Sequence, residues 1–186
     1  MTRTELYEDL NYVDATRKKR TEMAALVLDN PKVMKHLVDI AMTNDDPISS
    51  RACWVLEFVV KQKPSYIFSH LEDFTTRLGD VKLHSSVRPI AKICEILVKA
   101  YFSKKPNPVQ GKLNGGHLER IATACFDWLI GDHKVAAQAY SMTSLLLLGR
   151  KFDWILPELK MVLELNYANG SAAYKARARM TLAKIK

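Results

Sequence analysis

The sequence predicts an all-α fold, and three observations lead to that prediction. Apolar residues recur at three- and four-residue intervals along almost the whole chain, and no stretch shows the sustained alternation of a half-buried strand. The seven glycines and seven prolines are few for 186 residues, and they gather at a handful of places. The hydrophobic fraction of 48% and the charged fraction of 26% are ordinary globular values. We therefore expect long helices with sparse turns, in a chain of single-domain length.

Proline, glycine and acidic residues mark the helix ends in the first half of the chain. The first helix is short, and the second carries the basic cluster Arg17-Lys18-Lys19-Arg20. Turn signals follow at Asn30-Pro31, Asp45-Asp46-Pro47, Lys63-Pro64 and Gly79-Asp80. The helices expected between these signals are 3–11, 15–29, 31–43, 48–62, 65–78 and 83–102.

Glycine-containing turns divide the second half in the same way. A polar stretch ends at Gly116, and later turn signals are Gly131-Asp132, Gly149-Arg150 and Asn169-Gly170. The helices expected there are 117–130, 134–148, 154–168 and 172–185. The last sixteen residues hold no acid to oppose their basic side chains, which are Lys175, Arg177, Arg179, Lys184 and Lys186.

Four of these helices begin alike, which indicates an internal repeat. Each follows an aspartate or asparagine, then has a basic or amide residue five to eight positions later, then small and apolar residues. The basic or amide residues are Arg51, Arg88, Gln138 and Lys175. They lie 37, 50 and 37 residues apart in turn, so one period fits if about thirteen residues are inserted in the middle.

The segment 103–116 has the composition of that insertion. Its sequence, SKKPNPVQGKLNGG, contains two prolines, three glycines and three lysines and has no apolar periodicity. The partner helices agree independently, because the tetrapeptides HLVD at 36–39 and HLED at 70–73 match at three of four positions. We predict a single helical-repeat domain over 1–186 with an inserted loop at 103–116.

From these residues the chain resembles the HEAT/armadillo class of helical repeats. The segment 86–91, SVRPIA, is similar to the V-R-x-x-A opening of a second HEAT helix, and Asp46-Pro47 with Arg51-Ala52 is similar to its D-P and R-A form. Gln138 and Lys175 depart from the arginine, so the later repeats rest on period and hydrophobic pattern. The resemblance implies a right-handed α-solenoid of antiparallel helix pairs, with about four repeats plus capping helices, and it says little about function.

The repeat also predicts structural roles for its polar residues. We expect Arg51 and Arg88 to reach the acid that opens an adjacent unit, and Asp46 and Asp80 to cap helix N-termini. Cysteines 53, 94 and 125 each lie in an apolar helical stretch, which predicts buried free thiols.

The triplet Phe-Asp-Trp occurs twice, at 126–128 and at 152–154. The copies are 26 residues apart, out of phase with the repeat. Asp153 is placed to N-cap the helix whose first turn contains Pro157. Asp127 lies among apolar residues, so it either points out of the apolar stripe, bonds to Arg88 or the next turn's backbone, or serves as a functional acid beside an aromatic wall.

Most function classes leave no signature in the chain. Nucleotide-binding glycine loops and hydrolase motifs are absent, and the five histidines never pair at i, i+4, so we expect neither a cofactor nor a metal site. The opening MTRTELYEDL offers no apolar signal-peptide region, and the leucine run 145–148, like every other apolar run in the chain, is too short for a bilayer. We therefore expect a cytoplasmic protein with no membrane partner.

Three functional hypotheses remain open. The first is a non-enzymatic scaffold that holds a protein or peptide partner on the second helices around Arg51, Arg88, Gln138 and Lys175 and on the 103–116 loop. The second is a nucleic-acid binder, for which the net charge of +8 is suitable. The third is an assembly subunit whose aromatic and methionine-rich surfaces form an oligomer.

A base-excision enzyme is the most specific form of the second hypothesis. HEAT-type DNA glycosylases for alkylated bases use an aspartate, tryptophans and an arginine, and the distant likeness singles out Asp127 as a weak catalytic candidate. Residues of matching type for partner or nucleic-acid binding are Arg51, Trp54, Arg88, Trp128, Lys175, Arg177 and Arg179.

Overall fold

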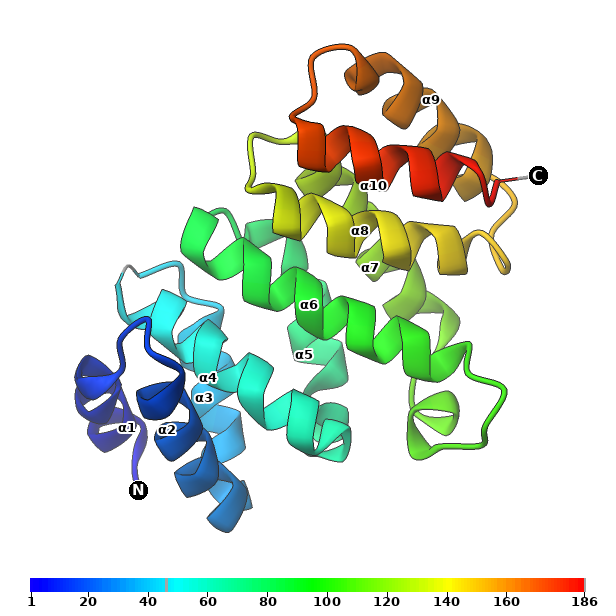
Figure 1. The fold of residues 1–186 in the computed structure, drawn as a ribbon. Helices are drawn as coiled ribbons and strands as arrows, with labels where there is room; N and C mark the ends of the chain where they lie inside the picture. The colour runs from blue at the N-terminus through cyan, green and yellow to red at the C-terminus, as the bar shows by residue number, and fades with distance from the viewer. Residues whose placement is uncertain (46, 186) are drawn as a thin grey trace. The chain divides into compact units, whose positions relative to one another are not determined.

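The computed structural model describes residues 1–45 and 47–185, and this part of the chain is all-α, with ten α-helices, five 3-10 helices and no strand (Figure 1). The all-α prediction is therefore confirmed. The α-helices are α1 (Arg3–Asp9), α2 (Arg17–Asp29), α3 (Met34–Ala41), α4 (Ile48–Gln62), α5 (Leu71–Thr76), α6 (His84–Tyr101), α7 (Gly115–Ile130), α8 (Val135–Leu148), α9 (Ile155–Tyr167) and α10 (Ala172–Leu182). The 3-10 helices are η1 (Leu10–Tyr12), η2 (Pro31–Val33), η3 (Pro64–His70), η4 (Leu78–Asp80) and η5 (Pro108–Gly111).

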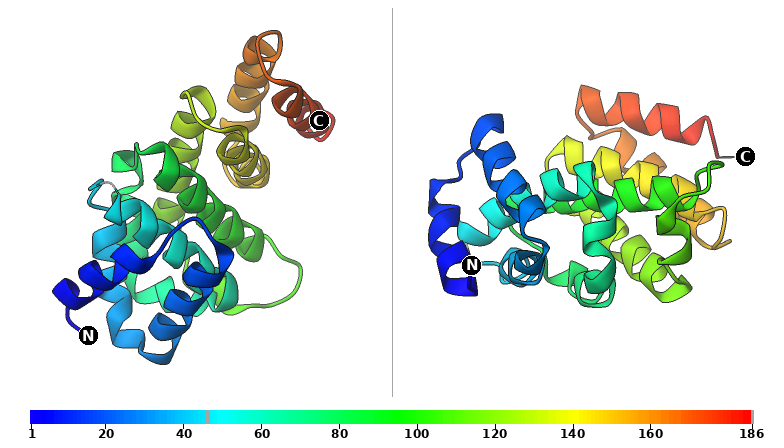
Figure 2. Two further views of the ribbon diagram at one scale, coloured as in Figure 1. Left: turned by 60° about the vertical axis from the view of Figure 1, so that its left-hand side comes forward. Right: turned by 90° about the horizontal axis from the view of Figure 1, so that it is seen from below.

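The chain divides into two compact units, Met1–Ile93 and Cys94–Lys186, whose boundary falls inside α6. In the first unit, α2 and α3 both pack on α4, and α1 contacts α3 (Figure 2). Leu56, Ile67 and Phe74 are fully buried in this unit. Each element buries one apolar stripe against its neighbours, which stabilises it by about 1.5–3 kcal/mol per large side chain.

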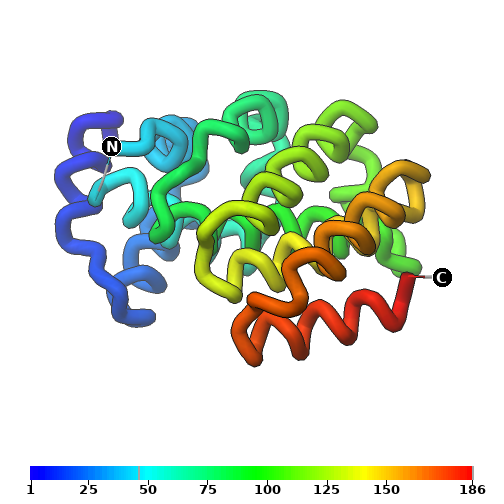
Figure 3. Tube along the Cα trace, turned by 90° about the horizontal axis from the view of Figure 1, so that it is seen from above, coloured from blue at the N-terminus to red at the C-terminus, as the bar shows by residue number. Residues whose placement is uncertain are grey.

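In the second unit, α7 packs against α8, and α10 packs against both α8 and α9. Figure 1 shows α8 and α10 side by side with α7 and α9 behind them, and Figure 3 shows the chain doubling back between α9 and α10. Leu129, Leu145 and Leu163 form part of the buried core. Among the described residues, none of the helices combines the length and apolarity that a membrane crossing requires.

Two expected helices are shorter than predicted because proline begins them. Pro31 and Pro64 start the 3-10 helices η2 and η3, since a missing N–H is tolerated only in a first turn. The expected helix 65–78 is therefore η3 followed by the six-residue α5. Apolar periodicity does not distinguish such tight turns from an α-helix, because both bring residues three apart onto one face.

The segment 103–116, which contains η5 and the start of α7, is held in place by two side chains. The Asn107 amide donates to the Ala100 carbonyl at 2.8 Å, and the Gln110 amide donates to the Ser103 carbonyl at 2.8 Å. Asn107 also forms a capping box with Gln110 at the start of η5. These bonds give side-chain donors to carbonyls in the last turn of α6 and just beyond it, where helical N–H donors run out.

The capping predictions fail at Asp80 and Asp153. Asp80 ends η4, four residues before α6 begins, so it is too early to be that helix's N-cap. The N-cap of α9 is Trp154, without a side-chain hydrogen bond, because the chain turns one residue later than the triplet suggests. Asp46 lies outside the described residues.

Candidate functional site

A contact between α4 and α6 explains the proline in the middle of α6. Pro89 has no N–H to donate to the carbonyl of Ser85, four residues earlier. The indole Nε1 of Trp54 donates to that carbonyl instead, at 2.9 Å. Beside it, the Ser50 hydroxyl lies 2.7 Å from the Ser85 hydroxyl and 3.1 Å from the Ser86 hydroxyl. Trp54 therefore has a structural role that its type alone did not reveal.

One turn further along α4, a carboxylate is buried between two cations. Glu57 is only 1% exposed. Its Oε2 accepts a hydrogen bond from Arg88 at 2.8 Å, and its Oε1 accepts one from the Lys61 ammonium. A buried carboxylate requires such partners, because the desolvation penalty of an unpaired charge is several kcal/mol. The expectation that Arg88 reaches an opening acid is corrected: its partner lies in the middle of α4.

Arg20 covers the aromatic side chains beside this ion pair. Its guanidinium carbon lies 5.6 Å from the Trp54 ring centroid and 5.4 Å from that of Phe58. Its Nε donates to the Thr16 carbonyl at 3.2 Å, and a terminal nitrogen donates to the Ala15 carbonyl. These contacts hold the guanidinium in a defined place with part of its surface open to solvent.

Together these side chains form an open cavity of about 520 Å³ within the first unit, which we call the basic pocket. It is lined by Arg17, Arg20, Thr21, Glu57, Phe58, Lys61, Gln62 and Arg88. Four positive side chains face one negative one, a net charge of +3. Both oxygens of that negative group are already hydrogen-bonded, so Glu57 is not available as a base. The pocket is therefore suited to binding an anion.

Arg51 lies apart from the basic pocket. Its guanidinium NH1 donates to the Asn11 carbonyl at 3.1 Å and lies 3.3 Å from the Asn11 side-chain oxygen. It thus ties α4 to the end of η1. The expectation that Arg51 reaches an acid is corrected, because backbone and amide oxygens left over at a helix end are its partners.

The two Phe-Asp-Trp copies meet, but not through their acids. The Phe126 and Trp154 rings stack with centroids 5.7 Å apart and an interplanar angle of 30°. Trp128 is only 3% exposed, whereas the neighbouring Asp127 is exposed. Asp127 thus points out of the apolar stripe, and Trp128 offers no accessible aromatic wall beside it.

The basic residues of α10 do not form one cluster. The Arg177 guanidinium donates to the Thr143 hydroxyl at 2.6 Å and so joins α10 to α8. Lys175 is half-buried and Arg179 is exposed. Arg177 is therefore occupied in packing, and Arg179 is the more accessible cation.

The thiols and the metal-type residues add no further site. Cysteines 53, 94 and 125 are free and buried, as predicted. Burial raises the pKa of Cys53 and of Cys125 to about 12 and raises that of Cys94 well above its ordinary value. In the described part of the chain, no group of three or more His, Cys, Asp or Glu residues is placed to hold a metal ion.

The sequence hypotheses included Arg88 and, as part of a basic face for nucleic acid, Lys61. Arg17 and Arg20 stood out only as members of a basic cluster, and Glu57 was missed. One signal was available: Glu57 is an acid in the apolar run VLEFVV with a lysine four residues later, the i, i+4 spacing of a helical ion pair. The same spacing recurs at the buried Glu95, whose Oε1 atom lies 2.7 Å from the Nζ atom of the exposed Lys99.

No protein-family model, no curated protein and no solved structure matches the chain. What the basic pocket can bind therefore follows from its residues, their charges and their contacts. Those point to a cationic, water-accessible surface with a fixed geometry.

Proposed function

We propose that this protein is a non-enzymatic helical-repeat module, an α-solenoid, that binds an acidic segment of a partner protein in its basic pocket. The observation that carries the proposal is the convergence of Arg17, Arg20, Lys61 and Arg88 on one cavity whose single carboxylate is already neutralised.

The repeat is supported by polar contacts that recur at similar separations. Ser50 meets Ser86, 36 residues later, and the Asn44 amide donates to the Asp80 carbonyl, also 36 residues later. In the second unit, Arg177 bonds to Thr143 across 34 residues. Recurrent bonds of this kind are what stacked units of one period would form.

The chemistry of the pocket favours carboxylates over an extended polyanion. Arginine guanidinium groups bind carboxylates through two parallel hydrogen bonds, which gives direction as well as charge. A cavity of about 520 Å³ accommodates a few side chains of a peptide. Duplex binding instead draws on cations spread along the phosphate backbone, which can contact about six to ten phosphates.

The test measures fluorescence anisotropy with a labelled peptide of alternating glutamate and glycine and with its glutamine analogue. We expect the acidic peptide alone to bind, with an affinity that falls as salt rises. Arg17→Glu should weaken binding about tenfold or more, because it reverses a charge at the pocket mouth. The matched control is Lys32→Glu, the same charge change at an exposed lysine of η2 outside the pocket.

Two results would overturn the proposal. Equal binding of the glutamine peptide would show that charge does not select the ligand. Equal losses in Arg17→Glu and Lys32→Glu would show that only net charge matters, and the nucleic-acid hypothesis would then take precedence.

A further inference from the structure

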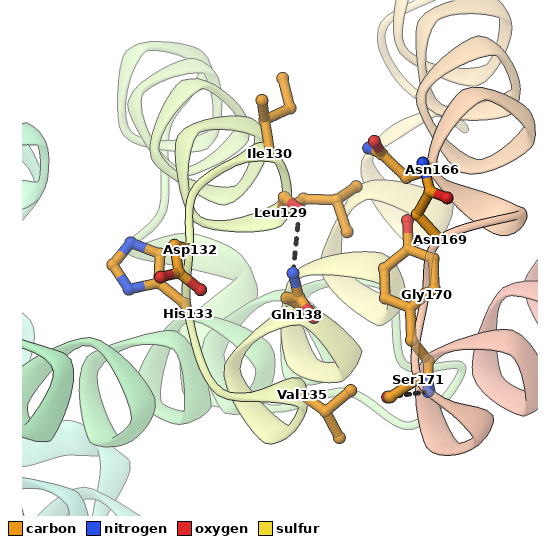
Figure 4. Close-up of a pocket in the computed structure, with 11 residues that line it drawn as sticks. Leu129, Ile130, Asp132, His133, Val135, Gln138, Asn166, Asn169, Gly170 and Ser171 are labelled. Atoms are coloured by element: carbon orange, nitrogen blue, oxygen red, sulfur yellow. Dashed lines mark hydrogen bonds between the residues drawn. The ribbon is translucent and has the colours of Figure 1, made fainter.

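A second cavity, of about 430 Å³, lies in the unit Cys94–Lys186 between the α7–α8 turn and the α9–α10 turn (Figure 4). Asn166 and Asn169 face Leu129 and Gln138 across it (Figure 4). The residues that line it are Leu129, Ile130, Asp132, His133, Val135, Gln138, Asn166, Asn169, Gly170, Ser171 and Tyr174. We call it the amide cavity, after its three carboxamide side chains.

The charge of this cavity differs from that of the rest of the protein. The chain carries a net charge of +8, yet no lysine or arginine is among the described residues that line the cavity. Its formal charge comes from Asp132. An anionic ligand would therefore find no cation here, and the cavity is suited to uncharged hydrogen-bonding groups.

Tyr174 is the residue that most needs a ligand. Its side chain lines the cavity and the residue is only 4% exposed, but its buried hydroxyl has no partner among the described residues at hydrogen-bond distance and angle; the Asn166 side chain, which also lines the cavity, acts on it only enough to oppose part of the rise in its pKa. Burial raises the pKa of Tyr174, so the phenol stays protonated and can donate. A buried hydroxyl without a partner is destabilising, which makes its retention at this place informative.

Gly170 fixes the direction of that hydroxyl. A Cβ atom at this position would lie 2.5 Å from the Cδ1 atom of Tyr174, so only glycine lets the ring lie against the α9–α10 turn. Ser171 caps α10 by accepting from the Tyr174 N–H at 3.2 Å, which holds the backbone of the same residue. The phenol is therefore preorganised.

The three carboxamides complete the hydrogen-bonding set. The Gln138 Nε2 donates to the Leu129 carbonyl at 3.3 Å, which leaves its oxygen as an acceptor (Figure 4). Asn166 and Asn169 each carry both donors and an acceptor. Beside them Ile130 is 60% exposed at the end of α7 and offers an apolar contact.

We propose that the amide cavity binds the main chain of an extended peptide segment, with its N–H and C=O groups paired to Tyr174, Asn166, Asn169 and Gln138 and one apolar side chain resting on Ile130. A peptide backbone presents donors and acceptors in alternation, as these side chains do. A sugar would need an open aromatic face, and the Tyr174 ring is buried. The amide cavity shares no lining residue with the basic pocket, so either binding proposal can be disproved without affecting the other.

The first test follows side-chain amide signals by NMR in the full chain during titration with N-acetyl-trialanine methylamide. We expect shifts at Gln138, Asn166 and Asn169 at millimolar peptide, and no shifts with the backbone N-methylated analogue, which lacks the N–H donors. Equal shifts with both peptides, or shifts with glucose instead, would overturn the proposal.

The second test is Tyr174→Phe, which removes only the hydroxyl. Because that hydroxyl is buried without a well-formed hydrogen bond to any described residue, we expect the melting temperature of the free protein to rise while affinity for the peptide falls about tenfold. The matched control is Tyr167→Phe on α9, outside the cavity, which should leave affinity unchanged. A lower melting temperature with unchanged affinity would show that the hydroxyl is structural and would overturn the proposal.

A second variant, at Gly170, tests whether peptide binding depends on the position of the Tyr174 ring. Gly170→Ala should displace the Tyr174 ring and abolish the amide shifts, because its new methyl group would overlap that ring. Gly79→Ala is the control, since a Cβ atom there meets nothing within 4 Å. Retention of full peptide binding in Gly170→Ala would contradict the proposed geometry.

Discussion

Trp54 and Pro89 depend on each other, although they lie on different helices. The proline leaves the Ser85 carbonyl without its helical donor, and the tryptophan supplies a replacement. Such exchanges are frequent where a proline lies within a helix, because a carbonyl without a partner lowers stability. Taken alone, Trp54 looks like a binding residue and Pro89 like a helix breaker. Together they form one structural contact.

Trp54→Phe should destabilise the protein by about 1 kcal/mol, since the Ser85 carbonyl is partly solvated and loses its donor. In a Pro89→Ala background the loss should be smaller, because the alanine N–H can donate to the same carbonyl. Urea unfolding of the wild type, both single variants and the double variant measures this coupling. Strictly additive changes would contradict the assignment.

The three buried thiols predict a loss of stability at alkaline pH. In the folded state their pKa values are raised, to about 12 for Cys53, whereas in the unfolded chain thiols titrate near 9. Above pH 9 the unfolded state therefore releases protons that the folded state keeps, and the free energy of unfolding falls as pH rises. Each thiol contributes about 1.4 kcal/mol per pH unit to that slope.

Replacing one thiol should reduce this alkaline slope. Cys53→Ala should remove about 1.4 kcal/mol per pH unit above pH 9, whatever its effect at neutral pH. Urea unfolding at several pH values between 8 and 11, under reducing conditions, gives the two slopes. Identical slopes in the variant and the wild type would show that Cys53 ionises in the folded protein.

At the scale of elements, one buried carboxylate joins α4 to α6, two helices that α5 separates along the chain. Glu57 of α4 forms an ion pair with Arg88 of α6. Lys61, which is also on α4, pairs with the same carboxylate. Arg88 is 29% exposed and Lys61 is 41% exposed, whereas Glu57 is 1% exposed. Removal of Arg88 therefore leaves a buried carboxylate, whereas removal of Glu57 leaves cations that water can reach.

Arg88→Met should cost about 2 kcal/mol, because it leaves a buried carboxylate with one cation. Glu57→Gln should cost less, about 1 kcal/mol, because the cations it frees can turn to water. Urea unfolding measures the stability of both variants. The control is Lys160→Met, which removes the exposed ion pair of Lys160 with Glu164. There we expect a change below about 0.5 kcal/mol, because surface ion pairs contribute little. A larger loss in Glu57→Gln than in Arg88→Met would contradict this account.

At the scale of the whole molecule, the net charge of +8 should produce weak, sequence-independent binding to nucleic acid. We expect a fluorescent duplex and a single strand to bind at about 50 mM salt and to be released by about 200 mM. Arg17→Glu should weaken this binding no more than Lys32→Glu, because the basic pocket is too confined for a duplex. Tight binding that persists at about 200 mM salt would instead favour the nucleic-acid hypothesis and call for a glycosylase assay of Asp127→Asn.

The all-α class, most helix positions and the buried thiols could be predicted from the sequence. These features depend on local interactions, because apolar periodicity at three and four residues and the turn residues between segments are visible within a short window. The errors lie where a tertiary contact replaced a local one. Trp54 donates to the Ser85 carbonyl that Pro89 leaves without a helical donor. Arg51 donates to the Asn11 backbone carbonyl and not to an acid.

The two cavities were decided by tertiary structure alone. Arg17 and Arg88 are 71 positions apart, and Leu129 and Tyr174 are 45 apart, yet each pair lines one cavity. The sequence determined which residues carry charge and which helices they occupy. Which of them face each other depends on how the helices pack, because side-chain convergence over such separations has no local signature.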